Sequence, residues 1–237
     1  MALLAEGKMP ERYQRNFGTV GIAGQIRLLK SKVAVVGAGG LGGTVIELLA
    51  RLGVGQLRII DGDTFAVHNL NRQLMSTEHN IGVNKAYAAA SRVEVINCDV
   101  QAEAIPCMLD EGNAEKLLKG VDVVVDALDN VSTRLLVNRV TKQYGIPLIY
   151  AAIAGFTGQV MTIMPGDNGL ERIYRQTNAP NQGVETMLGN PAGTPALAAS
   201  LQVQEVVKVI TGIGEPLRNK LLYFDTEMNV FEILTVT

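Results

Sequence analysis

Apolar residues along the first two thirds of the chain alternate between short continuous runs and longer stretches with helical spacing. The short runs, each suited to a buried strand, lie at residues 33–36, 56–60, 100–104, 121–127 and 148–152. The stretches with helical spacing lie at residues 41–52, 83–95 and 132–144. Strands that alternate with helices favour a parallel sheet with right-handed crossovers.

The pattern changes after Gly158, where this alternation stops. Residues 166–193 are rich in Gly, Asn and Pro and predict no regular element, and a loop of that length is usually functional. Around that loop we expect three strands, one helix and one hairpin turn, at residues 159–164, 220–224, 230–234, 195–211 and 225–229 in that order. Before the sheet, residues 11–29 predict a helix with an irregular middle at 18–24.

The fold class follows from this order of elements. We predict a Rossmann-like, doubly wound α/β fold, whose mostly parallel sheet is extended by C-terminal antiparallel strands. The chain has 237 residues, of which 47% are hydrophobic and 19% are charged, so it has enough apolar surface for one domain with a large core.

Charge and cysteine content narrow the classes of partner. The formal net charge is −2, which argues against nucleic acid and anionic membrane surfaces. No stretch approaches the ~20 apolar residues of a membrane helix. Two cysteines in a chain of this size exclude a disulfide framework, so we expect a cytoplasmic protein in a reducing compartment.

A glycine-rich loop joins the first predicted strand to the first helix of the sheet, and it consists of Gly37, Ala38, Gly39, Gly40, Leu41 and Gly42. Glycines let the backbone come close to an anion, and the helix N-terminus offers free N–H groups, so the loop indicates phosphate binding. Asp61 ends the next strand and is placed to accept hydrogen bonds from a ribose. A dinucleotide-binding dehydrogenase, or a tight turn without a ligand, has the same pattern.

Four charged residues separate these alternatives. Asp61, Arg72, Lys85 and Asp129 each follow a strand end or begin the next helix, and the carboxyl ends of parallel strands line one crevice. The two cations suit a polyphosphate, and a carboxylate with phosphate oxygens suits Mg²⁺. A nucleotidyl-transfer site needs such a cluster because negative charge builds on the phosphates, whereas hydride transfer does not.

A family resemblance rests on several motifs in their order along the chain, namely residues 12–15, the glycine-rich loop, residues 61–63, the Asn-Leu-Asn-Arg-Gln segment at 69–73, Lys85 and residues 129–130. The chain resembles the ThiF/MoeB/HesA family of ubiquitin-activating-enzyme-like adenylyltransferases from about residue 12 to 234. The resemblance implies that ATP adenylates a carboxylate, usually the C-terminal Gly-Gly of a small ubiquitin-like sulfur carrier. It also implies a nucleotide-binding part at about 31–152, and a crossover loop and acceptor-binding part at about 158–237.

The resemblance also implies roles for single residues. Arg72, Lys85 and Asp129 would act in catalysis, with Asp129 as the Mg²⁺ ligand, and Arg15 would reach into the site of a partner subunit in a homodimer. The other implied ATP contacts are Gly37, Gly39, Gly40, Leu41, Gly42, Asp61, Asp63, Asn69, Gln73 and Asn130. Among these, Asp61 would bind the ribose, Asn69 and Gln73 would surround the triphosphate, and Asn130 would lie near the adenosine.

The chain departs from the family in its cysteines. Many relatives bind zinc through two Cys-x-x-Cys pairs, and some use a cysteine of the crossover loop, but residues 171–176, 183–193 and 233–237 contain none. We therefore expect no zinc and an enzyme that stops at the acyl-adenylate. Cys98 and Cys107 are predicted to be buried, inert thiols.

Three other functions stay open at this point. The same site would adenylate a small-molecule or peptide carboxylate if the acceptor differs. An NAD(P)-dependent oxidoreductase shares the glycine-rich loop but has no use for the charged cluster. A non-catalytic nucleotide-binding regulator is disfavoured because the ATP-site residues are all present.

Overall fold

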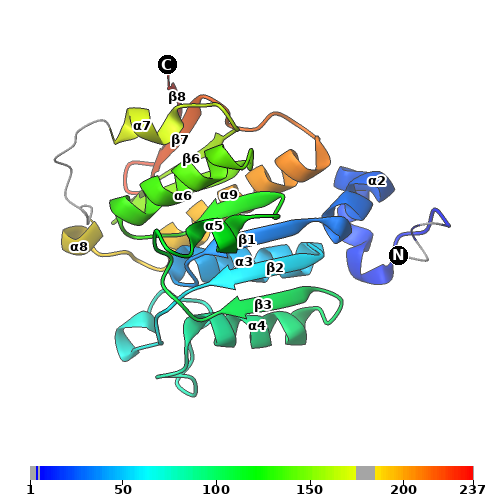
Figure 1. Ribbon diagram of the computed structural model, residues 1–237, viewed down its shortest axis with the longest axis horizontal. Helices are drawn as coiled ribbons and strands as arrows, with labels where there is room; N and C mark the ends of the chain where they lie inside the picture. The colour runs from blue at the N-terminus through cyan, green and yellow to red at the C-terminus, as the bar shows by residue number, and fades with distance from the viewer. Residues whose placement is uncertain (1–3, 5, 175–184, 237) are drawn as a thin grey trace.

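The computed structural model describes residue 4 and residues 6–174 and 185–236, and in these residues eight strands form one sheet (Figure 1). The strand order is β3-β2-β1-β4-β5-β6-β7-β8. The strands are β1 Lys32–Val36, β2 Gln56–Ile60, β3 Gln101–Ile105, β4 Val123–Asp126, β5 Leu148–Ala154, β6 Thr157–Ile163, β7 Lys220–Asp225 and β8 Val230–Thr235. The pairs among β1 to β5 are parallel and those from β5 to β8 are antiparallel, so the predicted fold class is confirmed.

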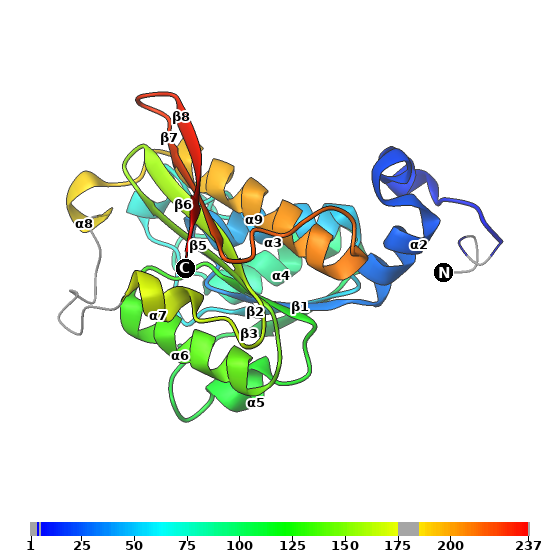
Figure 2. The same cartoon turned by 90° about the horizontal axis from the view of Figure 1, so that it is seen from above.

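Helices cover both faces of the sheet. The helices are η1 Glu11–Asn16, α2 Phe17–Lys30, α3 Gly40–Leu52, η2 Val67–Asn69, α4 Lys85–Ile96, α5 Ala114–Leu118, α6 Val131–Gln143, α7 Gly169–Ile173, α8 Glu185–Leu188 and α9 Gly193–Thr211. Figure 2 shows α3, α4 and α9 on one face and α5, α6 and α7 on the other. None of the described helices is long and apolar enough to cross a membrane.

The core is split by the sheet because successive side chains of a strand point to opposite faces. In β1, Val33 and Val35 belong to the apolar cluster beneath α3, α4 and α9, whereas Ala34 and Val36 belong to the cluster beneath α5 and α6. All four side chains are almost fully buried. This burial on both faces explains why the strand is a continuous apolar run in the sequence.

Most of the expected elements are found within a few residues of their predicted bounds. The irregular middle of the N-terminal helix is confirmed, since Gly21 interrupts α2 with φ of 61°. The expectation of no regular element at 166–193 was wrong for its described part, because α7 and α8 lie there. Both helices are too short to produce a helical period, as is α5, which was also missed. The remainder of that expected loop, residues 175–184, lies outside the described residues.

A buried carboxylate joins α3 to α4. Glu47 accepts hydrogen bonds from Arg51 on its own helix and from Arg92 on α4, with N–O distances of 2.6 and 2.9 Å. Burial alone would raise the pKa of Glu47, but the hydrogen bonds to Arg92 and Arg51 outweigh it and lower that pKa. A carboxyl with a lowered folded-state pKa stabilises the fold above its unfolded pKa, and this stabilisation is lost as the pH falls.

We expect Glu47→Gln to lower the free energy of unfolding by about 1 kcal/mol at pH 7, because it weakens charge-assisted hydrogen bonds to two arginines. The difference from the wild type should shrink as the pH falls below the ordinary value of 4.5. Urea denaturation at a series of pH values measures both effects. Glu171→Gln, which changes a more exposed pair with Lys142, is the control and should have little effect.

The glycine-rich loop turns tightly between β1 and α3. Gly37 has φ of 98°, and a Cβ there would lie 2.6 Å from the carbonyl oxygen of Ala127. A Cβ on Gly42 would lie only 1.8 Å from the carbonyl oxygen of Gly37. Neither contact is possible for a larger residue unless the backbone moves, so these two glycines are required by packing.

Gly42→Ala should therefore destabilise the fold by about 1–3 kcal/mol, as overpacking of a dense site does. Gly18→Ala is a matched control in α2, because a Cβ there meets no atom within 4 Å. Chemical denaturation of the two variants tests the packing argument. Equal stability of the two would show that the loop has room that the structure does not indicate.

Candidate active site at the carboxyl ends of the strands

A cavity of about 380 Å³ opens where the parallel strands end. Its walls include residues at or just after the carboxyl ends of β1, β2, β3, β4 and β5. Because β4 lies between β1 and β5 in the sheet, the cavity has two halves. We call them the glycine-loop half, over β1 to β3, and the β5 half.

Most of the site residues predicted from the sequence line this cavity. They are Gly37, Gly39, Gly40, Leu41, Asp61, Asp63, Arg72, Gln73, Lys85, Asp129 and Asn130. The structure thus brings together the four charged residues expected to converge. Gly42 and Asn69 are not among the lining residues. Gly42 packs on the carbonyl oxygen of Gly37, and Asn69 accepts a hydrogen bond from the backbone of Ala66.

Asp61 ties the glycine-rich loop to the end of β2. Its Oδ2 accepts a hydrogen bond of 2.7 Å from the backbone N–H of Ala38, and its Oδ1 accepts one of 2.8 Å from the N–H of Asp63. Burial raises the pKa of the Asp61 carboxyl, and these two hydrogen bonds oppose that rise. The carboxylate therefore fixes the loop as well as facing the cavity.

Lys85 is the first residue of α4, and its side chain is almost fully buried. Its Nζ lies 3.1 Å from Oδ2 of the exposed Asp63. The preceding residue, Asn84, caps the helix by accepting hydrogen bonds from the N–H groups of Ala86 and Tyr87. The same side chain donates to the carbonyl oxygens of Asp61 and Asp63, so it holds α4 against the end of β2.

Asn69 shapes the segment that carries Arg72 and Gln73. Its Oδ1 accepts from the N–H of Ala66 at 2.9 Å, and its carbonyl oxygen accepts from the N–H groups of Arg72 and Gln73. The predicted triphosphate contact of Asn69 is untested, but its position behind the wall gives it a structural role.

Two polar groups of this segment face the cavity without a strong partner. Within the described part of the chain, the Arg72 guanidinium donates only to neutral oxygens, those of the His68 carbonyl and the Asn71 side chain, both at 3.0 Å. No carboxylate among the described residues pairs with it. The Oε1 atom of Gln73 is buried and has no hydrogen-bond partner in the described structure. An unpaired cation and an orphaned acceptor indicate room for a polar ligand.

Asp129 and Asn130 lie in the turn between β4 and α6. Asn130 caps α6, because its Oδ1 accepts from the N–H of Thr133 at 2.9 Å. Asp129 is exposed, and its Oδ1 accepts a weak hydrogen bond of 3.4 Å from Nδ2 of Asn130. A single exposed carboxylate fits Mg²⁺, which usually takes one or two carboxylates and completes its shell with phosphate oxygens and water.

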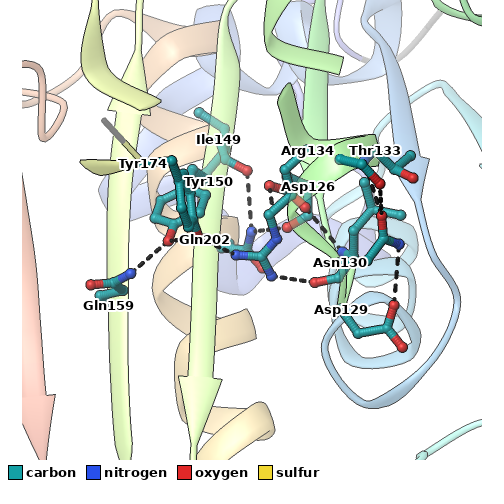
Figure 3. A network of polar contacts seen from close by, with 12 residues as sticks. Asp126, Asp129, Asn130, Thr133, Arg134, Ile149, Tyr150, Gln159, Tyr174 and Gln202 are labelled. Carbon is teal, nitrogen blue, oxygen red and sulfur yellow. Dashed lines mark hydrogen bonds and ion pairs between the residues drawn. The ribbon is translucent and has the colours of Figure 1, made fainter. Parts of the chain in front are cut away.

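A buried polar network behind this turn was missed by the sequence analysis (Figure 3). Its centre is Arg134 on α6, whose Nε lies 3.7 Å from Oδ2 of the fully buried Asp126. The Arg134 guanidinium also donates to the hydroxyl of Tyr174 and to the carbonyl oxygen of Leu128. Asp126 ends the otherwise apolar strand β4. A buried carboxylate needs a partner, so this residue was the sign in the sequence that a buried cation lies nearby.

Burial dominates the electrostatics of this network. It raises the pKa of the Asp126 carboxyl, although Arg134 pulls in the opposite direction. It also raises the pKa of the Tyr150 hydroxyl well above the usual value. For Arg134, burial opposes the charge, but the carboxylate of Asp126 outweighs it and the pKa rises. Arg134 is therefore a permanent buried cation.

The prediction for the two cysteines was wrong. Cys98 is exposed, in the turn between α4 and β3. Cys107 is half-buried and lines the glycine-loop half of the cavity, because it follows the carboxyl end of β3. The number of cysteines gives no information on where each one lies in the sheet. A residue in the turn after a parallel strand, such as Cys107, can reach the crevice.

Arg15 lies far from the cavity of its own chain. It is exposed on η1, and the neighbouring Tyr13 accepts a hydrogen bond from Asn97, which precedes β3 at the amino end of the sheet. Figure 1 shows the N-terminal helices at the opposite end of the molecule from α8. Within one chain, the structure does not bring Arg15 to the other predicted site residues.

Comparison with known proteins gives matches over nearly the whole chain. The SAMP-activating enzyme E1 of Haloferax volcanii is 37% identical over 235 residues, covering 98% of this chain and 87% of that protein. The sulfur carrier protein adenylyltransferase of Thermus thermophilus is 37% identical over 235 residues, covering 95% of this chain and 87% of that protein. The crystal structure of E. coli MccB with ATP has a TM-score of 0.84 at 23% identity, covering 95% of this chain and 72% of that one, and so shows the fold.

A family profile described as the ThiF family matches residues 13–237. Because this match takes in nearly all of the chain, including every element that surrounds the cavity, the protein belongs to the ThiF family.

Proposed function

We propose that this protein is an ATP-dependent adenylyltransferase that activates the C-terminal glycine carboxylate of a small ubiquitin-like sulfur carrier. The observation that carries the proposal is the cavity, in which the glycine-rich loop, Arg72, Lys85 and Asp129 face one space. The names of the relatives at 37% identity support it, because they describe an activating enzyme and a sulfur carrier adenylyltransferase.

The site residues suit ATP in the glycine-loop half. The N-terminus of α3 follows the glycines and offers free backbone N–H groups to a phosphate. Lys85 and Arg72 supply positive charge beside that loop. Asp61 lies at the end of β2, where a carboxylate accepts hydrogen bonds from a ribose in related sheets. Gln73, with its orphaned Oε1, offers one more polar contact.

Asp129 would hold a Mg²⁺ ion, which neutralises charge on the phosphates when it is bound. Asp129 lines the cavity and follows β4, the strand that lies between β1 and β5 in the sheet. We propose that the acceptor enters from the β5 half, which is lined by Ala152, Ile153, Tyr174 and Asn190. Two of these residues, Tyr174 and Asn190, belong to the part at about residues 158–237 that the resemblance assigns to the acceptor.

The chemistry needs no activated nucleophile, because a terminal carboxylate is already ionised near pH 7. One of its oxygens attacks the α-phosphorus of ATP, the bond to the bridging oxygen breaks, and pyrophosphate leaves. Arg72 and Lys85 stabilise the negative charge that builds on the transferred and leaving phosphates. The protein's other task is to align the two reactants in line.

A small-molecule or peptide carboxylate is the alternative acceptor for the same site. We favour a carrier protein because the two relatives at 37% identity are named as a SAMP-activating enzyme and a sulfur carrier protein adenylyltransferase. We also propose that the enzyme acts in the cytoplasm, without zinc. The residues that hold the zinc in many relatives have no counterpart in this sequence.

Arg72→Ala should lower the rate of acceptor adenylation about a hundredfold, the scale for removing one preorganised charge stabiliser. The assay incubates the enzyme with Mg-ATP and Gly-Gly-ending carrier proteins, and detects AMP addition by intact mass. Arg139→Ala is the control, because Arg139 lies on the exposed side of α6 and pairs there with the exposed Glu111 of a preceding loop. Near-normal turnover of Arg72→Ala contradicts the assignment, and ATP binding without carrier modification favours the small-molecule acceptor.

We further propose a homodimer in which Arg15 of one subunit completes the site of the other. Its exposure supports this, as does the place of the N-terminal helices at the opposite end of the molecule from α8 (Figure 1), because from there Arg15 reaches such a site only in another copy.

The dimer makes a quantitative prediction. Arg15→Ala and Asp129→Ala should each be nearly inactive, but their mixture after refolding or coexpression should recover about a quarter of the wild-type activity. Half of the random dimers are mixed, and each mixed dimer has one intact site of two. No recovery in mixtures shown to contain mixed dimers would contradict a site shared between subunits.

A further inference from the structure

Arg134 occupies the junction between the two halves of the cavity. It lies in the first turn of α6, the helix that follows β4. In the sheet, β4 separates β1 from β5. Arg134 lines the cavity and is 6% exposed as a residue. Figure 3 shows its guanidinium between the turn that carries Asp129 and the pair Tyr150 and Tyr174.

On the side of the glycine-loop half, Arg134 holds the residue that precedes Asp129. Its Nη2 donates to the carbonyl oxygen of Leu128. The N–H of the same Leu128 donates to Oδ1 of Asp126 at 3.0 Å. Both backbone groups of Leu128 are thus fixed by the buried Arg134–Asp126 pair, and the position of Asp129 follows from them.

On the side of the β5 half, Arg134 holds a pair of tyrosines. Its Nη1 donates to the Tyr174 hydroxyl at 3.1 Å, and its guanidinium lies over the Tyr150 ring, 5.2 Å from the centroid. The two hydroxyl groups are 2.8 Å apart, and Gln159 donates to that of Tyr150 at 2.5 Å. This chain of contacts joins α6 to β5, β6 and the end of α7.

Asp126, the partner of Arg134, is also held from the other face of the sheet. Gln202 on α9 donates through Nε2 to the carbonyl oxygens of Asp126 and Ile149, at 2.8 and 3.2 Å. These bonds cross from α9 to β4 and β5, so the two strands that meet beneath the junction are held together. The position of Arg134 is therefore set by the core and not by solvent.

We propose that Arg134 is a positioning residue for the reaction, which fixes the Asp129 turn and Tyr174 relative to each other and thereby aligns the acceptor carboxylate with the bound nucleotide. The inference rests on the proposed adenylyl transfer. A guanidinium is suited to this task because its rigid fork contacts a carboxylate, a carbonyl oxygen and a hydroxyl at once, whereas an ammonium group cannot match that geometry.

The variant Arg134→Lys tests the proposal and keeps a positive charge beside the buried Asp126, which would otherwise be left uncompensated. We expect kcat for acceptor adenylation to fall about a hundredfold, as small misplacements of reacting groups do. The Mg²⁺ concentration needed for half-maximal ATP binding should rise about tenfold, the usual scale for loss of an outer-shell partner. ATP affinity without Mg²⁺ should stay within about twofold of the wild type.

The variant Tyr174→Phe tests the other side of the junction and removes a single hydroxyl. We expect KM for the acceptor to rise about tenfold while KM for ATP is unchanged. Tyr144→Phe is the matched control, because Tyr144 at the end of α6 loses a comparable hydroxyl bond to Glu115 but does not line the cavity. It should leave both KM values unchanged.

Calorimetry of ATP binding over a range of Mg²⁺ concentrations separates this inference from the proposed function, because it needs no acceptor. An unchanged Mg²⁺ requirement in Arg134→Lys overturns the inference. So does a fall in thermal stability of Arg134→Lys and Tyr174→Phe with no change in kcat or acceptor KM, since that is a structural role alone. A wild type that binds Mg-ATP normally but adenylates no carrier overturns the proposed acceptor, and leaves the Mg²⁺ result as the test of Arg134.

Discussion

The close approach of two backbone turns is the constraint on which the site depends. The glycine-rich loop after β1 passes so near the start of the β4–α6 turn that Gly37 has no room for a Cβ beside Ala127. The first turn of α3 has the same constraint at Gly42, which packs on the carbonyl oxygen of Gly37. This packing brings the N-terminus of α3 and the Asp129 turn to one edge of the sheet. The groups that we propose for phosphate and for Mg²⁺ therefore line the same cavity.

Much of the fold followed from periodicity, because strands buried on both faces are continuous apolar runs and the helices between them are amphipathic. The charged part of the site also followed, since residues after the ends of parallel strands meet at one edge. Lys85 and Asp129 are far apart in sequence, yet topology alone was enough to place them together.

Other features depend on side-chain packing that a pattern of residue types does not contain. Arg134 has the sequence context of an ordinary surface residue early in a helix, and only the fold turns it toward Asp126 and Tyr174. The resemblance assigns Asn69 to the triphosphate, which stays a prediction, and the structure adds that its Oδ1 accepts from the N–H of Ala66 and closes its own turn. Cys107 was predicted to be a buried thiol, although the end of β3 places it at the cavity, where it is half-buried. For Arg134 and Cys107 the local sequence fits two positions, and contacts between elements far apart in the chain select one.

The charged side chains at the cavity are of two kinds, those paired by the fold itself and those left without a partner of opposite charge in the part of the chain that the structure describes. Lys85 has Asp63 as its counter-ion, and Arg134 has the buried Asp126. Arg72 has no carboxylate partner among the described residues, and Asp129 is exposed with one weak hydrogen bond. The buried pair keeps its charges matched, because a lone charge in the core would cost several kcal/mol. The mismatched charges are left at the surface of the cavity, where water solvates them in the free protein. Under the proposed function, a polyphosphate with a divalent cation would supply the two opposite charges that Arg72 and Asp129 lack, so binding would complete a charge pattern that folding leaves open.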